Sequence, residues 1–155
     1  MRIDLITIAN KAPNWVNQGY QDYSQRLKDP SLHLIEIPLQ KRTNPNQLAQ
    51  HLAKESEQIL KACQNAQYIV ILDSSGKSYT SEQLAQRLLY WQSQAQRLAL
   101  IIGGPEGLSP TIKARAHESW SLGALTLPHP LVRIVAAEAL YRAHSINQNH
   151  PYHRA

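Results

Sequence analysis

The chain has 155 residues, of which 43% are hydrophobic and 17% are charged. This is the size of a single domain with a substantial core, and the apolar content excludes an intrinsically disordered chain. The 16 basic residues exceed the 11 acidic ones, and the resulting net charge of +5 favours an anionic partner, most commonly nucleic acid.

The sequence carries no sign of secretion, of a membrane or of a metal. Its first residues do not form a signal peptide, and its apolar runs are far shorter than the ~20 residues that cross a bilayer. A single cysteine, Cys63, excludes an internal disulfide, and the seven histidines form neither a His-Glu-x-x-His motif nor a Cys–His cluster. We therefore expect one cytoplasmic domain over residues 1–155, with no metal and no membrane as partners.

The first half of the chain alternates between extended and helical patterns. Apolar runs predict strands at 2–9, 32–38 and 67–72. Apolar residues at helical spacing predict helices at 13–28 and 45–63, each beginning at a proline and the second preceded by a polar loop.

Each of these helices has an apolar stripe that we expect to face the core. The stripe residues are Trp15, Val16, Tyr20, Tyr23 and Leu27 in the first helix, and Leu48, Leu52, Ile59 and Leu60 in the second. Cys63, at the end of the second helix, is expected to be a small core or boundary residue.

The second half continues the alternation after a Ser-Gly loop that follows Asp73. A helix is predicted at 81–93, with Thr80 or Ser81 as its N-cap, and a strand at 97–102. A short helix at 110–116, a strand at 119–122 and a last helix at 130–147 complete the chain.

This alternation predicts an α/β fold with a mostly parallel sheet covered by helices on both faces. In such sheets the ligand site lies outside the carboxyl ends of the strands. We therefore expect a site where the chain leaves its strands, in the loops that begin at Leu72, Gly103 and Leu122.

Two glycine-containing segments resemble phosphate or nucleotide motifs without matching them. Gly76-Lys77-Ser78 lacks the earlier glycine of a P-loop, because Ile71 occupies that position, and an ordinary turn is expected instead. Gly103-Gly104-Pro105-Glu106-Gly107 is not a dinucleotide fingerprint; it is either a tight strand-to-helix turn or a close approach of backbone to a ligand. We expect Glu106 to be structural.

The segment 120–127 is unusual, because it is an apolar loop of small and aliphatic residues followed by Pro128 and Pro130. Exposed loops are normally polar, so this loop is either simply buried or wraps an apolar ligand. Its backbone N–H and C=O groups need partners, and a flat heteroaromatic ring such as adenine supplies both donors and acceptors. The loop therefore favours a nucleoside-like cofactor.

The tail combines basic and aromatic residues, among them Arg142, His144, Tyr152, His153 and Arg154. Such a mixture suits RNA, where bases stack on aromatic rings and arginine contacts phosphate. A solvated terminus is the alternative interpretation.

Together these segments resemble the RlmH family of methyltransferases. The resemblance rests on Leu72-Asp73, on Ile-Gly-Gly-Pro-Glu-Gly-Leu-Ser at 102–109, on Leu-Thr-Leu-Pro-His-Pro-Leu-Val-Arg at 125–133 and on Asn-His-Pro-Tyr-His-Arg at 149–154. It covers the whole chain. The family methylates N3 of a pseudouridine in helix 69 of 23S rRNA. The resemblance thus implies this activity here, with S-adenosylmethionine as methyl donor.

The resemblance also implies a SPOUT-type α/β fold with a carboxyl-terminal trefoil knot, and a homodimer. The knot is implied by the family alone, because chains almost never thread their own loops. The cofactor-binding residues that it implies are Leu72, Gly103, Leu122, Gly123, Ala124, Leu125, Thr126 and Leu127. Gly123 departs from the serine of related members but keeps a small residue, so we expect backbone contacts to survive.

No motif in the sequence identifies the base that removes the pseudouridine N3 proton. The candidates are His153 and Arg154 in the tail, with Arg142 positioning a phosphate or carboxylate and His129 as a further possibility. In a dimer the tail of one subunit could complete the site of the other. The modest charge suggests that the assembled 70S ribosome, rather than naked RNA, presents the target.

A different class of function remains open at this point. An RNA- or ribosome-binding factor that keeps the fold without catalysis would explain the basic tail, but not the apolar loop at 122–127. A small α/β hydrolase is disfavoured, because the sequence lacks a Gly-x-Ser-x-Gly nucleophile motif. Binding of the cofactor would distinguish the methyltransferase from the binding factor without catalysis.

Overall fold

The computed structural model describes residues 1–40 and 45–154. Five parallel strands form one sheet in the order β2-β1-β4-β3-β5. Their bounds are Arg2–Ile8 (β1), Ser31–Ile37 (β2), Tyr68–Ser78 (β3), Arg97–Ile102 (β4) and Glu118–Ser121 (β5). The predicted α/β fold with a parallel sheet is confirmed. The polar loop expected before the second helix includes residues 41–44, which lie outside the described part.

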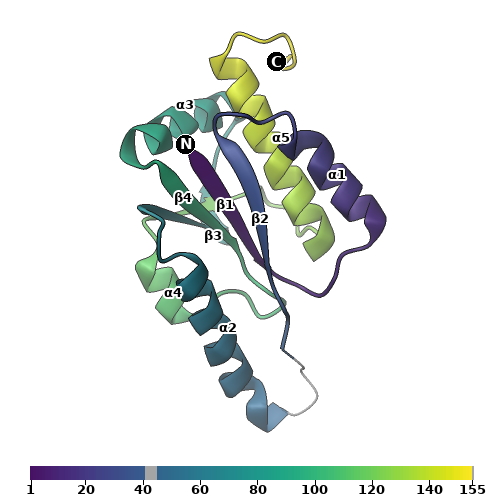
Figure 1. Ribbon diagram of the computed structural model, residues 1–155, viewed down its shortest axis with the longest axis vertical. Coiled ribbons are helices and arrows are strands. Elements are labelled where there is room, and N and C mark those ends of the chain that lie inside the picture. The colour runs from purple at the N-terminus through teal and green to yellow at the C-terminus, as the bar shows by residue number, and fades with distance from the viewer. Residues whose placement is uncertain (41–44, 155) are drawn as a thin grey trace.

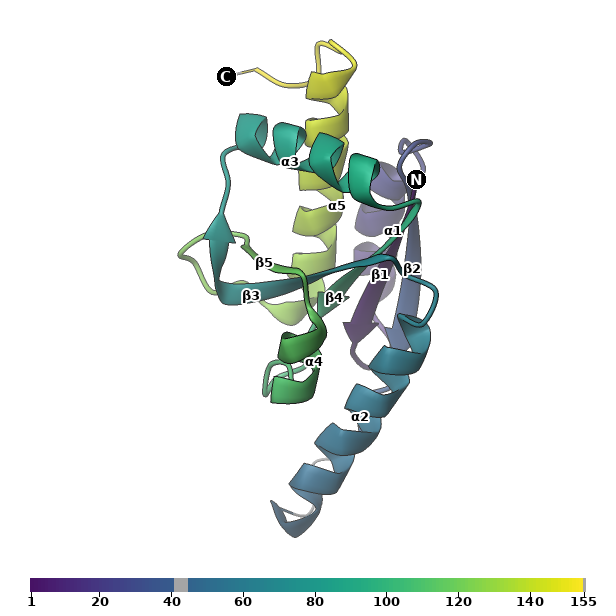
Figure 2. The ribbon, with the colours of Figure 1, turned by 90° about the vertical axis from the view of Figure 1, so that its left-hand side faces the viewer.

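Helices cover both faces of the sheet, as predicted (Figures 1 and 2). On one face lie α1 (Asn14–Ser24), α3 (Ser81–Gln94) and α5 (His129–Asn147). On the other lie α2 (Leu48–Ala62), which follows the short 3₁₀ turn η1 (Pro45–Gln47), and α4 (Pro110–Arg115). Within the described part of the chain, no helix is long and apolar enough to cross a membrane.

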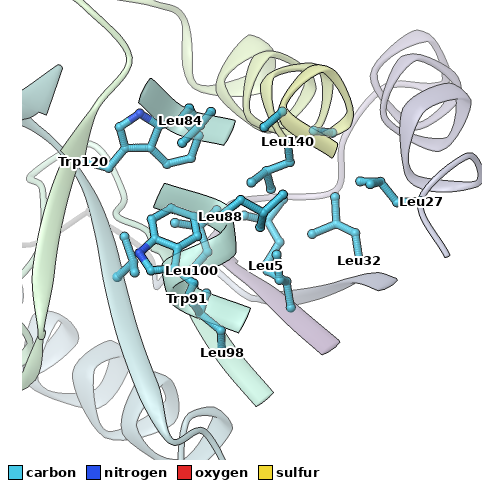
Figure 3. Packing of buried hydrophobic residues seen from close by; sticks show 14 of the residues in the cluster. Leu5, Leu27, Leu32, Leu84, Leu88, Trp91, Leu98, Leu100, Trp120 and Leu140 are labelled. Carbon is cyan, nitrogen blue, oxygen red and sulfur yellow. The ribbon is translucent and has the colours of Figure 1, made fainter. Parts of the chain in front are cut away.

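Two apolar cores follow from the alternation of side chains along the strands. The larger core packs Leu5, Leu98 and Leu100 of the sheet against Trp91 and Leu140 of the helices (Figure 3). The smaller core lies on the opposite face and also contains Cys63, as expected. Burial raises the pKa of the Cys63 thiol to about 11, so at neutral pH it is a small apolar side chain rather than a nucleophile.

The predicted apolar stripes of the first two helices are only partly correct. In α1, Val16 and Tyr20 are buried, but Trp15 is 55% exposed because it lies about 100° around the helix from Val16, beside the polar Asp22. In α2 only Ile59 of the predicted stripe is buried. Leu48, Leu52 and Leu60 are half-buried. The amino-terminal end of α2, which carries Leu48 and Leu52, extends away from the sheet (Figure 2), whereas Leu60 packs against the edge of the smaller core.

The prediction of a Ser-Gly loop after Asp73 is wrong, because β3 continues to Ser78. Leu72 and Lys77 both pair with Trp120 of β5, so residues 73–76 form a bulge between two paired stretches. Gly76 permits the contact: a Cβ there would lie 2.6 Å from Ser119 Oγ and 2.7 Å from the Ser119 carbonyl carbon. The Gly-Lys-Ser sequence is therefore neither a phosphate loop nor an ordinary turn.

The short edge strand β5 is tied to α3 by the Glu118 carboxylate. It accepts hydrogen bonds from Tyr68 Oη at 2.7 Å, from Trp91 Nε1 at 2.9 Å and from the Arg87 guanidinium. Burial alone would raise the pKa of Glu118, but these hydrogen bonds and the Arg87 charge lower it overall. The N-cap of α3 is Thr80, whose hydroxyl accepts from the Gln83 N–H, one of the two residues predicted.

Replacing Glu118 is expected to destabilise the fold. Glu118→Ala leaves the buried Trp91 indole N–H, the Tyr68 hydroxyl and Arg87 without their acceptor, and should lower the free energy of unfolding by about 3 kcal/mol. Glu118→Gln keeps one acceptor and should cost about 1 kcal/mol. Chemical denaturation of both variants measures the difference, and equal stabilities for all three proteins would contradict the proposed role.

The pH dependence of the free energy of unfolding supplies a second test of the role of Glu118. Since the folded-state pKa of Glu118 lies below its unfolded value of 4.5, its stabilising contribution is present above pH 4.5 and disappears as the pH falls through the folded-state pKa. Glu118→Gln should lack this part of the acid destabilisation.

Candidate active site

The carboxyl ends of β4 and β5 and the start of the bulge in the middle of β3 surround a cavity of about 420 Å³, within the usual size range of small-molecule sites. Three segments form most of its wall: residues 72–74 of β3, the turn after β4 and the loop between β5 and α5. All eight residues predicted to bind the cofactor line this cavity: Leu72, Gly103, Leu122, Gly123, Ala124, Leu125, Thr126 and Leu127. Parallel strands bring them together, although they are up to 55 positions apart in the sequence.

The turn after β4 needs glycine at two positions. A Cβ on Gly103 would lie 2.9 Å from the Gly107 carbonyl carbon and 3.0 Å from Leu108 Cγ. The Gly107 N–H donates to the Gly104 carbonyl at 2.9 Å, and Gly107 has a φ of +77°. This segment is therefore a tight strand-to-helix turn that also forms a cavity wall, which combines the two interpretations left open by its sequence.

The loop between β5 and α5 presents backbone polar groups to the cavity. The hydroxyl of buried Ser121 accepts from the Gly123 N–H and donates to the Gly123 carbonyl, both at 3.2 Å. In the described part of the chain, residues 122–127 form no backbone–backbone hydrogen bond. Outside Gly123, whose N–H and carbonyl are bonded to Ser121, the donors and acceptors of this run lie beside apolar side chains and fit a flat heteroaromatic ring. Gly123 has a φ of +129°, a conformation that favours glycine at this position.

Two charged side chains face each other in the lining. Asp73 Oδ1 accepts hydrogen bonds from the Ser75 N–H and the Ser75 hydroxyl, both at 3.1 Å. Asp73 Oδ2 lies 3.5 Å from Lys113 Nζ of α4. The Ser75 N–H lowers the pKa of Asp73, with further contributions from the Ser75 hydroxyl and Lys113, so the carboxyl is ionised at neutral pH.

His129, at the first position of α5, is the third titratable group of the lining. Its Nε2 lies 3.2 Å from Oγ1 of buried Thr7. Burial lowers the pKa of His129 below 6.5, and the nearby positive charge of buried Arg133 lowers it further. At neutral pH the imidazole is therefore uncharged, which is the state that a general base requires.

The candidate catalytic residues of the tail are held by α5 and α3. Arg142 Nη1 donates to His153 Nδ1 at 3.1 Å, and the guanidinium also bonds Glu138 Oε1 at 2.7 Å. His153 Nε2 lies 2.9 Å from Glu82 Oε1. Because Nδ1 accepts from an arginine, the proton of a neutral His153 lies on Nε2.

The tail does not reach the cavity within one chain. Tyr152 packs against the Tyr141 ring and donates to Glu138, which fixes the tail at the carboxyl end of α5. His129 lines the cavity at the opposite end of this helix, and a rise of 1.5 Å per residue places Arg142 about 20 Å away. Figure 1 shows the carboxyl-terminal tail at one end of α5 and the first turn of this helix at the other. The structure thus brings His153 and Arg142 together, but away from the cavity, and Arg154 follows them in the tail and is exposed.

Sequence reasoning missed several lining residues, among them Asp73, Ser74 and Lys113. Asp73 follows Leu72 directly at the end of a predicted strand, so the strand-end rule could have found it. Nothing in the sequence marked Lys113, because it reaches the cavity from α4 through tertiary packing. Within the described residues, no group of three or more His, Cys, Asp or Glu side chains could hold a metal ion.

Comparison with known proteins finds one matching family and a relative of high sequence identity. Residues 1–153 match the family described as "Predicted SPOUT methyltransferase". The chain is 61% identical over 156 residues to the Ribosomal RNA large subunit methyltransferase H of Dichelobacter nodosus (strain VCS1703A), covering 100% of both chains.

Two solved structures share the fold at low sequence identity. The probable methylase family protein from Haemophilus influenzae Rd KW20 has a TM-score of 0.63 at 10% identity, with 99% of this chain and 70% of that chain covered. The probable methyltransferase from Bordetella pertussis Tohama I has a TM-score of 0.61 at 15% identity, with 92% and 93% covered.

The lowered pKa of His129 can be measured directly. An NMR titration of the imidazole Hε1 resonance, assigned by its loss in His129→Gln, should give a midpoint below 6.5. Because the folded protein then binds fewer protons than the unfolded chain, His129 should reduce stability as the pH falls below 6.5. A midpoint at or above 6.5 would show that burial and Arg133 do not control this side chain.

Proposed function

The chain belongs to the SPOUT methyltransferase family and, within it, to the RlmH family, and we propose that it methylates the large-subunit ribosomal RNA with S-adenosylmethionine as methyl donor. The observation that carries this proposal is the full-length identity of 61% to a ribosomal RNA large subunit methyltransferase H. The cavity at the strand ends, lined by all eight expected cofactor residues, supplies independent physical support.

The cavity fits the cofactor in size and chemistry. The backbone groups at 122–127 that form no backbone–backbone hydrogen bond would hold the adenine, and Leu72 and the Gly103 turn would close the slot around the rest of the molecule. When bound, S-adenosylmethionine supplies a methyl group that is already activated on a positively charged sulfur. The protein's task is then to orient this group toward the nucleophile and to exclude water, and orientation can provide much of the rate.

The substrate is, in our proposal, N3 of a pseudouridine in helix 69 of 23S rRNA on the assembled 70S ribosome. N3 must lose its proton before or during transfer, so a base or a stabilising cation must approach it. His153 and Arg154 are the candidates, with Arg142 holding His153 through the 3.1 Å contact to Nδ1. Both ring nitrogens of His153 are engaged in the free chain, and the accepting nitrogen is Nδ1, so its action as base requires release of Nδ1 from Arg142. Uncharged His129 in the cavity wall is the further candidate.

The tail and the cavity lie at opposite ends of α5 in one chain. In a homodimer, the tail of one subunit could instead complete the cavity of the other. The support for this arrangement is the distance of about 20 Å between the tail and the cavity along α5 of one chain. Exposed apolar side chains, Trp15 at 55% and Leu125 at 83%, offer surface for such a contact.

We also propose that residues 1–155 form a single domain, that the carboxyl-terminal part is knotted as in other SPOUT proteins, and that the protein acts in the cytoplasm beside the ribosome. The single sheet shared by both cores supports a single domain. The family match over residues 1–153 supports both the single domain and the knot. A crystal structure of the protein in its solution assembly would test the knot and the dimer together, and an unthreaded chain or a monomer would contradict them.

A methylation assay tests the proposed activity. Purified protein with methyl-labelled S-adenosylmethionine is given 70S ribosomes, 50S subunits, free 23S rRNA or a helix 69 transcript that contains pseudouridine. We expect label in 23S rRNA from 70S particles only, and mass spectrometry should place it on one pseudouridine. If no substrate is labelled and calorimetry detects no cofactor binding, the enzyme is excluded and a ribosome-binding factor without catalysis remains.

Mixed dimers test whether the tail acts across subunits. One variant carries His153→Ala and Arg154→Ala, and the other carries Gly103→Val, whose side chain collides with the Gly107 backbone and should distort the turn that forms one wall of the cavity. Each homodimer should lose at least about 100-fold in activity. If the tail acts in trans, a mixed dimer combines one intact cavity with one intact tail and should regain about half of the wild-type activity per dimer. Mixed dimers as inactive as the parents would place tail and cavity in the same subunit.

A further inference from the structure

Asp73 is the only carboxylate among the described residues that line the cavity. It opens the bulge of β3, directly after Leu72, and its side chain is 19% exposed. The two Ser75 hydrogen bonds to Oδ1 fix the orientation of the carboxylate, so its negative charge occupies a set place in the wall.

The charge of Asp73 is only loosely compensated. Lys113 Nζ lies 3.5 Å from Oδ2, longer than the 2.7–2.9 Å of a close charged hydrogen bond. The Lys113 side chain is 51% exposed, so solvent screens it more strongly than it screens Asp73. His129, the remaining titratable group of the lining, is uncharged at neutral pH because its pKa is lowered. The interior of the cavity therefore faces a fixed anion.

We propose that Asp73 makes this cavity prefer a positively charged sulfonium cofactor to its neutral thioether product. S-adenosylmethionine and S-adenosylhomocysteine differ by one methyl group and one positive charge, so apolar contacts and the adenine slot hardly distinguish them. A nearby carboxylate in a partly desolvated wall does distinguish them, because its attraction acts on the charged sulfur alone. Product thus leaves more readily than the donor, which limits product inhibition. This inference rests on the proposed function of the same cavity.

Calorimetry with three probes tests the proposal: S-adenosylmethionine, S-adenosylhomocysteine and sinefungin, which carries an amine in place of the sulfonium methyl. Asp73→Asn keeps the shape of the side chain and an oxygen for the Ser75 N–H. We expect it to weaken binding of the two charged probes by about tenfold and of S-adenosylhomocysteine by less than about threefold. High salt should reduce the preference of the wild-type protein.

Asp22→Asn is the matched control, because it removes one negative charge from an exposed site on α1 that does not line the cavity. It should leave the ratio of the affinities unchanged, and thermal unfolding should confirm that both variants are folded. If Asp73→Asn weakens all three probes by the same factor, or none, the inference is wrong while the cofactor site stands. If the wild-type protein binds none of the probes, the proposed function itself fails.

Discussion

The close contact of β3 and β5 at Gly76 determines the shape of the candidate site. A side chain at this position would collide with both the hydroxyl and the backbone of Ser119, so only glycine lets the two strands pair again after the bulge. That second pairing confines residues 73–76 to a bulge, and Leu72 and Asp73 line the cavity together with the turn after β4. With the strands paired in this way, the loop at 122–127 leaves β5 next to both segments and closes the third side of the cavity.

The sequence predicted those features that depend on local pattern or on the geometry of parallel strands. The apolar runs gave all five strands within one or two residues at most ends, and the strand-end rule located Leu72, Gly103 and the 122–127 loop before any contact was known. The extension of β3 was missed because Asp73 to Ser78 has no apolar pattern, and its pairing depends on β5, about 45 residues later. Trp15 was misplaced because its spacing resembles that of buried residues, although its direction around the helix differs. The ion pair of Asp73 with Lys113 is likewise a tertiary contact, invisible in the sequence.

Helix α5 connects the two halves of the candidate site and also keeps them apart. Its first turn provides His129 to the cavity wall, whereas its last turns carry Arg142 and anchor the tail through Glu138. The helix is packed between α1, α3 and the sheet, with Ala136, Ala137 and Leu140 fully buried, so it cannot bend to bring its ends together. If the cavity and the tail belong to one site, as we propose, a second chain or the RNA must bridge them, which is the physical reason for favouring a shared site.

The same structure bears on how RNA is recognised. Phosphate binding draws on free cations, yet many basic side chains of this chain are already paired with carboxylates of their own fold. Arg87 bonds Glu118, Arg142 bonds Glu138, and Arg97 bonds buried Asp4. Breaking such pairs to bind phosphate would leave carboxylates uncompensated, so the count of 16 basic residues overstates the number of cations available to a nucleic acid. Affinity for a particular nucleotide must then come from shape and from contacts that a folded particle presents, and this favours an assembled ribosome over isolated RNA as the substrate.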